Sequence, residues 1–164
     1  MRSSRHAPEA PDPGSVRRAV EDEAIVLTGL AVRAKAHWGY GREFLDRALG
    51  ELTVDGRDIG RGRVWVAEHQ GRVVGFYALD LDARPPELTA LFVEPAWIGR
   101  GFGKALLRDA LARAAAAGVA GLVIESDPNA VAFYEAHGAV RQASRRSAST
   151  GRALPVLYIP TSGA

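Results

Sequence analysis

A glycine-spaced turn lies between a strand-like run and a long helical pattern in residues 91–107, which read LFVEPAWIGRGFGKALL. The strand-like run ends at Pro95, and Gly99, Gly101 and Gly103 precede the helical pattern. Glycines at alternate positions let a backbone turn its N–H groups toward one point, and a helix N-terminus adds a partial positive charge. This strand–turn–helix unit therefore predicts an α/β fold with a site for phosphate or pyrophosphate.

Two common phosphate-binding motifs do not fit this turn. A nucleotide P-loop needs GxxxxGK[ST], but counting back from Gly103 and Lys104 puts Ile98 at the first glycine and Ala105 at the hydroxyl position. A dinucleotide-binding GxGxxG would need glycine at Lys104 or Leu106. Neither motif therefore identifies the phosphate-bearing ligand.

The turn is similar instead to the acyl-CoA signature of the GNAT superfamily of N-acyltransferases. That signature reads V-x-P, a spacer, then [QR]xxGx[GA] at the start of a helix with paired leucines. The matching residues are Val93, Pro95, Gly101, Gly103, Leu106 and Leu107, while Ile98 stands at the usual Gln or Arg position. Residues 127–138, DPNAVAFYEAHG, resemble a second family pattern, N-x-x-A-x-x-[FL]-Y-x-x-x-G, with Asp127 at the usual asparagine. Residues 34–40 also resemble a segment of a bacterial-type GNAT subgroup.

Hydrophobic periodicity and turn residues predict alternating elements along the chain. Strands are expected at 16–20, 64–69, 73–81, 87–93, 122–125, 140–144 and 154–159, and helices at 22–37, 43–52, 102–117 and 129–137. This order resembles the GNAT fold, an α/β architecture with a mixed central sheet of about seven strands flanked by about four helices. We expect residues 1–15 to form a disordered tail and residues 16–164 a single domain.

Charge and composition narrow the class of protein. The net charge is +2, with basic residues spread among acidic ones rather than gathered in a stripe. There is no cysteine, so thiolate metal sites and a cysteine nucleophile are excluded. No apolar run approaches the ~20 residues of a membrane span. We expect a cytoplasmic protein that binds no metal, no nucleic acid and no membrane.

The resemblance implies acetyl-CoA as co-substrate. Backbone N–H groups of residues 100–104 would bind its pyrophosphate, and strand residues 91–93 would pair with its pantetheine arm. The implied contacts are Leu91, Phe92, Val93, Ile98, Gly99, Arg100, Gly101, Phe102, Gly103, Lys104, Asn129, Phe133 and Tyr134. For Asn129 the alternative role is to cap the following helix.

The implied reaction is transfer of the acetyl group to a primary amine by direct attack in a ternary complex. An alkylammonium of pKa ~10.4 must lose its proton at a cost of roughly 4.6 kcal/mol at pH 7, so a general base is useful. The candidates are Glu87 and Glu125, each at a strand end, with a solvated or a helix-capping carboxylate as the alternative. Strand alternation predicts Glu87 on the face of Leu91 and Val93. Tyr134 matches the family's general acid, although packing beside other aromatic side chains would also explain it.

The acceptor site is implied to lie under the segment between the first two helices, with His37, Trp38 and Tyr40 as candidates. Aromatic anchoring of the helix turn is the alternative for these residues. The acceptor is a small-molecule or peptide amine, and the resemblance suggests a homodimer formed through the C-terminal strands. Two other functions remain open. One is a catalytically weak CoA-binding sensor or structural module, and the other is a nucleotide-binding domain whose loop only resembles the CoA signature.

Overall fold

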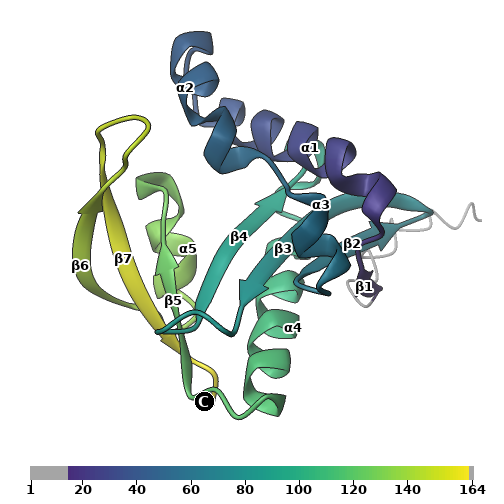
Figure 1. The fold of residues 1–164 in the computed structure, drawn as a ribbon, viewed down its shortest axis with the longest axis vertical. Coiled ribbons are helices and arrows are strands. Elements are labelled where there is room, and N and C mark those ends of the chain that lie inside the picture. The colour runs from purple at the N-terminus through teal and green to yellow at the C-terminus, as the bar shows by residue number, and fades with distance from the viewer. Residues whose placement is uncertain (1–14, 163–164) are drawn as a thin grey trace, which may run out of the picture.

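The computed structural model describes residues 15–162, so all but the last residue of the predicted N-terminal tail lies outside the described residues. Figure 1 shows a sheet with helices packed on both faces. The strands are β1 Val16–Arg18, β2 Val64–His69, β3 Arg72–Asp80, β4 Glu87–Val93, β5 Gly121–Glu125, β6 Val140–Arg146 and β7 Ala153–Pro160. The helices are α1 Ala24–His37, α2 Arg42–Leu52, α3 Gly56–Gly60, α4 Phe102–Ala116 and α5 Val131–Glu135.

The seven strands form one mixed sheet in the order β1-β2-β3-β4-β5-β7-β6. Every neighbouring pair is antiparallel except β4 and β5, which run parallel and are connected through α4. The predicted mixed sheet of seven strands is therefore confirmed. The only parallel pair lies at the centre of the sheet, beside the glycine-spaced turn.

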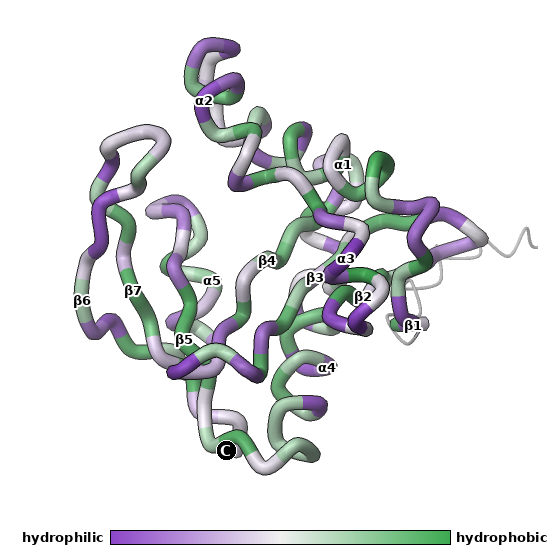
Figure 2. Tube along the Cα trace, in the orientation of Figure 1, coloured by the Kyte–Doolittle hydropathy of each residue, from purple (hydrophilic) through white to green (hydrophobic). Residues whose placement is uncertain are grey.

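Two hydrophobic cores lie on opposite faces of the sheet. One contains Leu106, Leu107 and Ala110 of α4 together with side chains of α5, and the other contains Leu27 and Leu30 of α1 with side chains of α2 and α3. Figure 2 shows hydrophobic residues along the central strands and hydrophilic ones over much of α2 and β6. All seven residues of β6, an edge strand, are exposed. The sheet thus has an α4–α5 face and an α1–α2 face.

A β-bulge in β4 changes which side chains share a face. Leu79 pairs with Leu88, but Ala78 pairs with Ala90, so Thr89 is an extra residue on β4. An extra residue breaks strand alternation, and Leu88 and Leu91 consequently pack into the same α4–α5 core. The expectation that Glu87 shares a face with Leu91 and Val93 is therefore wrong. Glu87 lies on the α1–α2 face.

The other differences from the predicted elements are local. Helix α3 has five residues, two of them glycines, and shows no hydrophobic periodicity; it begins where the Asp55 carboxylate accepts a hydrogen bond from the Arg57 N–H at 2.8 Å. The predicted helix 129–137 is a 3-10 turn, Pro128–Ala130, followed by α5. The predicted helix from residue 22 also begins with a 3-10 turn, Glu21–Glu23. Such short elements depend on tertiary contacts more than on sequence pattern.

Candidate functional site

The central parallel strands separate soon after they meet. Among the described residues, β4 and β5 are in register only at Glu87 and Val123, with the Val123 N–H donating to the Pro86 carbonyl at 2.9 Å. Figure 1 shows the two strands diverging from that end. The other edge of β5 is fully paired with β7. Most of β4 therefore presents a free backbone edge toward the opening between the two strands.

The glycine-spaced turn lies at the far end of β4 and supplies a row of free donors. Gly99 and Gly101 have φ angles of 79° and 89°, the left-handed region that glycine adopts readily. The first helical hydrogen bond runs from the Ala105 N–H to the Gly101 carbonyl at 3.0 Å. No described residue accepts a hydrogen bond from the six consecutive N–H groups of residues 99–104. A row of free donors beside the positive end of the α4 dipole is suited to binding an anion.

Aromatic side chains support the turn from below. The Arg100 guanidinium lies 4.7 Å from the centre of the Trp97 ring. Trp97 contacts His69 and Phe102, with ring centres 5.1 Å and 5.8 Å apart, and Phe102 is buried. Ile98, at the family's Gln or Arg position, is exposed. These aromatic contacts hold the start of the turn against the body of the protein.

Helix α5 brings Phe133 and Tyr134 to the same region. A Cβ atom placed on Gly103 would lie 3.5 Å from the Phe133 ring and 3.8 Å from Val93 Cγ2, so three of the predicted cofactor contacts are neighbours. The Tyr134 ring lies 5.2 Å from that of Phe133 and is buried in the α4–α5 core. Burial raises the pKa of the Tyr134 hydroxyl, which therefore keeps its proton at neutral pH.

The two candidate bases lie together on the other face. Glu87 and Glu125 line a cavity of about 120 Å³ with Val123, Val156, Arg145 and residues 83–85. The Arg145 guanidinium donates to Glu125 at 3.0 Å, whereas no ion pair of Glu87 forms with a described residue. Burial raises the pKa of Glu87, and the negative charge of Glu125 raises it further. A carboxylate with a raised pKa is a better proton acceptor at neutral pH.

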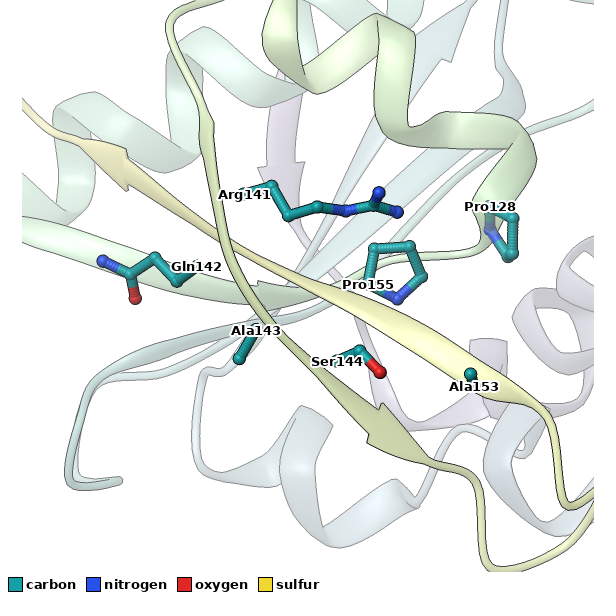
Figure 3. A pocket seen from close by; sticks show the side chains of 7 residues that line it. All are labelled: Pro128, Arg141, Gln142, Ala143, Ser144, Ala153 and Pro155. Carbon is teal, nitrogen blue, oxygen red and sulfur yellow. The ribbon is translucent and has the colours of Figure 1, made fainter.

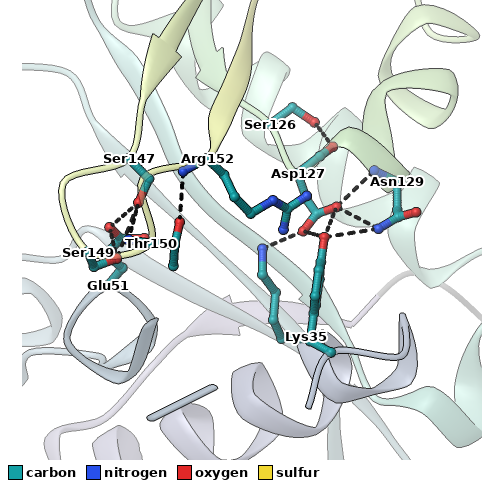
Figure 4. Close-up of polar contacts among 10 residues, drawn as sticks. Lys35, Glu51, Ser126, Asp127, Asn129, Ser147, Ser149, Thr150 and Arg152 are labelled. Atoms are coloured by element: carbon teal, nitrogen blue, oxygen red, sulfur yellow. Dashed lines mark hydrogen bonds and ion pairs between the residues drawn. The ribbon is translucent and has the colours of Figure 1, made fainter. Parts of the chain in front are cut away.

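A polar cluster ties α1 to the loop that follows β5 (Figure 4). The Asp127 carboxylate accepts hydrogen bonds from Lys35 Nζ at 2.5 Å, the Tyr40 hydroxyl at 3.0 Å and the Asn129 N–H at 2.8 Å. Burial opposes the charge of Asp127, but these donors outweigh it and hold the pKa of that carboxyl below its usual value. Asn129 also donates to the Tyr40 hydroxyl, at 3.1 Å. The expected capping role of Asn129 is therefore wrong: Asp127 caps the 3-10 turn, and Asn129 only donates its N–H to that carboxylate.

The three candidate acceptor residues differ in position. Tyr40 belongs to the polar cluster, stacks on Phe44 with ring centres 4.3 Å apart, and has a pKa raised by burial. His37 and Trp38 lie at the exposed end of α1, with ring centres 5.9 Å apart, and Trp38 is 47% exposed. The structure thus brings only Tyr40 to the cluster.

Sequence reasoning missed Lys35 and Arg152 as site residues. The Arg152 guanidinium lies 4.7 Å from the centre of the Tyr40 ring, although the two residues are far apart in the sequence. No local pattern indicates this contact, because it depends on the fold of the β6–β7 hairpin. Lys35 carried one signal, since it is one of only two lysines in the chain.

A second, wider depression lies on β6 and β7. It encloses about 660 Å³ and is lined by Pro128, Arg141, Gln142, Ala143, Ser144, Ala153 and Pro155 (Figure 3). Arg141 is the charged residue in this lining, which contains no carboxylate or imidazole for acid–base chemistry. In residues 15–162 no helix is long and apolar enough to cross a membrane, and no three His, Asp or Glu side chains gather as metal ligands.

The mixed sheet opens beside a helix N-terminus lined with free N–H donors, which places a ligand-binding opening at the centre of an α/β fold. Residues 60–138 match the profile of the family described as acetyltransferase (GNAT) domain. This match spans just under half of the chain, and it supports an acyltransferase with the GNAT fold. The recognition, fold class and enzyme class expected from the sequence are thereby confirmed.

Solved structures share the fold at low sequence identity. A GCN5-related N-acetyltransferase from Rhodopseudomonas palustris is 21% identical over 93% of this chain and 96% of its own, with a TM-score of 0.75. The PaiA N-acetyltransferase from Thermoplasma acidophilum, solved with coenzyme A, is 16% identical over 89% and 98%, with a TM-score of 0.70. The ribosomal-protein-S18-alanine N-acetyltransferase from Escherichia coli is 19% identical over 92% and 95%, with a TM-score of 0.66. No curated protein sequence matches the chain.

Proposed function

We propose that the protein transfers the acetyl group of acetyl-CoA to a primary amine within a ternary complex. The observation that carries this proposal is the row of six unpaired N–H groups of residues 99–104 at the N-terminus of α4. A pyrophosphate presents several acceptor oxygens and negative charge, which this row of donors matches. The coenzyme A bound in the Thermoplasma acidophilum relative supports the same ligand class.

The pyrophosphate position at residues 99–104 fixes where the rest of acetyl-CoA would lie. Residues 99–104 hold the pyrophosphate, and the free edge of β4 over residues 91–93 pairs with the amides of the pantetheine arm. Val93, Gly103 and Phe133 form the wall beside it. The thioester then lies toward the point where β4 and β5 meet, between the two faces of the sheet. It supplies an acetyl group whose C–S bond breaks as the new C–N bond forms.

The acid and the base lie on opposite faces of the sheet, which suits this reaction. Glu87 accepts a proton from the acceptor's ammonium group on the α1–α2 face, and the free amine then attacks the thioester carbonyl carbon. Tyr134 donates a proton to the departing sulfur from the α4–α5 face and regains one from solvent. The products are the N-acetylated amine and the CoA thiol, with one proton released.

The test measures ligand binding and turnover separately. Acetyl-CoA at about one hundred times its dissociation constant should stabilise the fold by roughly 2.7 kcal/mol, a rise of several degrees in Tm. CoA should act alike, and ATP and NAD should leave the Tm unchanged. Release of the CoA thiol is then followed with a panel of primary amines. Stabilisation by ATP or NAD alone would contradict the proposal, and tight acetyl-CoA binding without turnover on any amine would favour a sensor.

A further inference from the structure

The Arg152 guanidinium lies beside Tyr40, and one of its nitrogens has no hydrogen-bond acceptor among the described residues. Its Nη1 atom is buried and has no hydrogen-bond acceptor among the described residues. Arg152 also forms no ion pair with a described carboxylate, although Asp127 and Glu51 both lie in the surrounding cluster. Arg152 as a whole is partly buried, and a buried N–H donor without an acceptor is costly. A cost of this kind points to a ligand that supplies the missing acceptor.

The guanidinium of Arg152 packs against two aromatic rings. It lies 4.7 Å from the centre of the Tyr40 ring and 5.2 Å from that of Phe44, and these rings are stacked on each other. Stacking on an aromatic face leaves the N–H fork in the guanidinium plane available for a planar anion. A carboxylate matches that fork with two parallel hydrogen bonds.

The tip of the β6–β7 hairpin is anchored, so Arg152 is positioned in advance. Ser147 Oγ and Ser149 Oγ both donate to the Glu51 carboxylate of α2, at 3.0 Å and 2.5 Å. The Arg152 N–H donates to Thr150 Oγ1 at 3.4 Å. These contacts, seen in Figure 4, span almost a hundred residues of sequence. Both serine hydroxyls donate to Glu51 Oε1, and Glu51 forms no ion pair with Arg152 among the described residues.

The other cation of the cluster is already neutralised. Lys35 forms an ion pair with Asp127. The Lys35 side chain is 15% exposed and the Asp127 side chain 11%. Arg152 is therefore the cationic side chain of this cluster that remains for an incoming anion. Asp127 follows Glu125 by two residues, so an extended chain puts their Cα atoms about 7 Å apart. The Arg152 side chain thus approaches the segment that carries one of the two candidate bases.

We propose that Arg152 binds a carboxylate of the acceptor, so that the acceptor is an amine that also carries a carboxylate: a free amino acid or a peptide C-terminus. This inference rests on the proposed acetyltransferase function and adds the acceptor's chemical class. The amine lies at the Glu87–Glu125 cavity, and the carboxylate lies on the Arg152 fork beneath the hairpin tip. Tyr40 and Phe44 hold the fork in place and form the apolar side of the acceptor cleft.

The experiment compares acceptors that differ only in the carboxylate. Initial rates are measured with free L-amino acids and their amides, and with lysine-ended peptides carrying a free or an amidated C-terminus. The carboxylate member of a productive pair should have at least a tenfold higher kcat/KM. The more productive of the two pairs then identifies the source of the carboxylate.

Arg152→Gln should raise the KM of the carboxylate acceptor by about 10- to 100-fold, in line with the loss of a charge-assisted bidentate pair. The KM of acetyl-CoA and the rates with the amides should stay as in wild type. Arg152→Lys should restore part of the preference. Arg146→Gln is the matched control, because Arg146 lies on the same hairpin and, within residues 15–162, its side chain donates only to the Gly151 carbonyl, at 2.8 Å.

Equal use of acids and amides by the wild type, or an equal loss of both in Arg152→Gln, would overturn the inference. Binding without turnover gives an independent readout. In the presence of CoA, N-acetyl amino acids should raise the Tm of the wild type, and their amides should not. Loss of that difference in Arg152→Gln, with the acetyl-CoA shift unchanged, supports the inference. Failure of the proposed function itself is distinguishable, because acetyl-CoA would then produce no shift in any variant.

Discussion

Lys35, near the end of α1, donates a hydrogen bond to the Asp127 carboxylate at 2.5 Å and so joins two segments 92 residues apart in the sequence. Both side chains are largely buried, at 15% and 11% exposed. The pair belongs to the polar cluster in which Tyr40 and Asn129 also donate to Asp127. Asp127 replaces the asparagine usual in the family pattern, so Lys35 has a charged partner rather than a neutral one.

Breaking this pair should lower the free energy of unfolding. We expect Lys35→Met to lower it by roughly 1–3 kcal/mol, because a mostly buried carboxylate loses its partner. Lys104→Met, at the only other lysine, should change stability by less than about 0.5 kcal/mol, as for an exposed side chain. Urea unfolding of the ligand-free variants measures both. A Lys35→Met protein as stable as wild type would show that the ion pair makes no net contribution to the free energy of unfolding.

The same pair predicts the acid dependence of stability. The folded-state pKa of Asp127 is lowered, so its contribution is present above the unfolded pKa of about 3.9 and is lost as pH falls through the folded value. Asp127→Asn should therefore reduce stability at pH 6 and flatten its decline below about pH 4. Unfolding curves from pH 6 down to pH 3 check this. An unchanged slope would mean that other carboxylates dominate the acid limb.

Gly101→Ala tests the pyrophosphate site. A Cβ atom on Gly101 meets nothing in the protein within 4 Å and would point into the open space beside the turn. We expect the Kd for CoA to rise at least tenfold, because the methyl group occupies space that the pyrophosphate needs. Gly118→Ala is the matched control at the other end of α4. Its φ is 78°, its Cβ would also be unobstructed, and its backbone strain of about 1–2 kcal/mol should be similar.

Calorimetric titration with CoA separates the two effects. Both variants should lose similar stability, but only Gly101→Ala should lose affinity. Equal affinity for CoA in the two folded variants would show that residues 99–104 do not bind the pyrophosphate.

The parts of the fold that follow local patterns could be predicted from the sequence. The bounds of β4 agree with the structure, and α4 ends within one residue of its prediction, because period-2 and helical spacing show directly in these segments. The glycine-spaced turn is also local, so its place between them could be inferred. The bulge at Thr89 could not, because it depends on how β3 pairs with β4.

The same limit applies to the site. The bulge reversed the expected face of Glu87, which in turn places the two candidate carboxylates together on the α1–α2 face. Arg152 reaches Tyr40 only because the hairpin tip folds onto α2. Contacts between segments so far apart leave no spacing in a single sequence. Charged residues in a hairpin are ordinarily solvated, so Arg152 carried no signal of its own.

The carboxylate pair predicts a specific pH profile. Glu87→Gln should lower kcat/KM by about 10²- to 10⁴-fold, the contribution of a general base. Glu125→Gln should instead move the acid limb of the profile to lower pH, because a negative charge that raises the pKa of Glu87 is gone. Glu135→Gln, at an exposed position on α5, should behave as wild type. Full activity in Glu87→Gln would mean that Glu125 or a water molecule, and not Glu87, accepts the proton from the ammonium group.

Tyr134→Phe should lower kcat by about 10²-fold, the lower end for general acid catalysis, since a thiolate of pKa ~8.5 needs only modest assistance. Burial raises the pKa of Tyr134, so the hydroxyl stays protonated above pH 9 and adds no basic limb in that range. The affinity for acetyl-CoA should stay nearly constant, because the ring and its packing are retained. Tyr158→Phe is the control, since its hydroxyl lies against Gly121 at the start of β5. Steady-state rates from pH 6 to pH 9.5 and CoA titrations measure both variants. A normal kcat in Tyr134→Phe would make that side chain structural and require another proton donor for the sulfur.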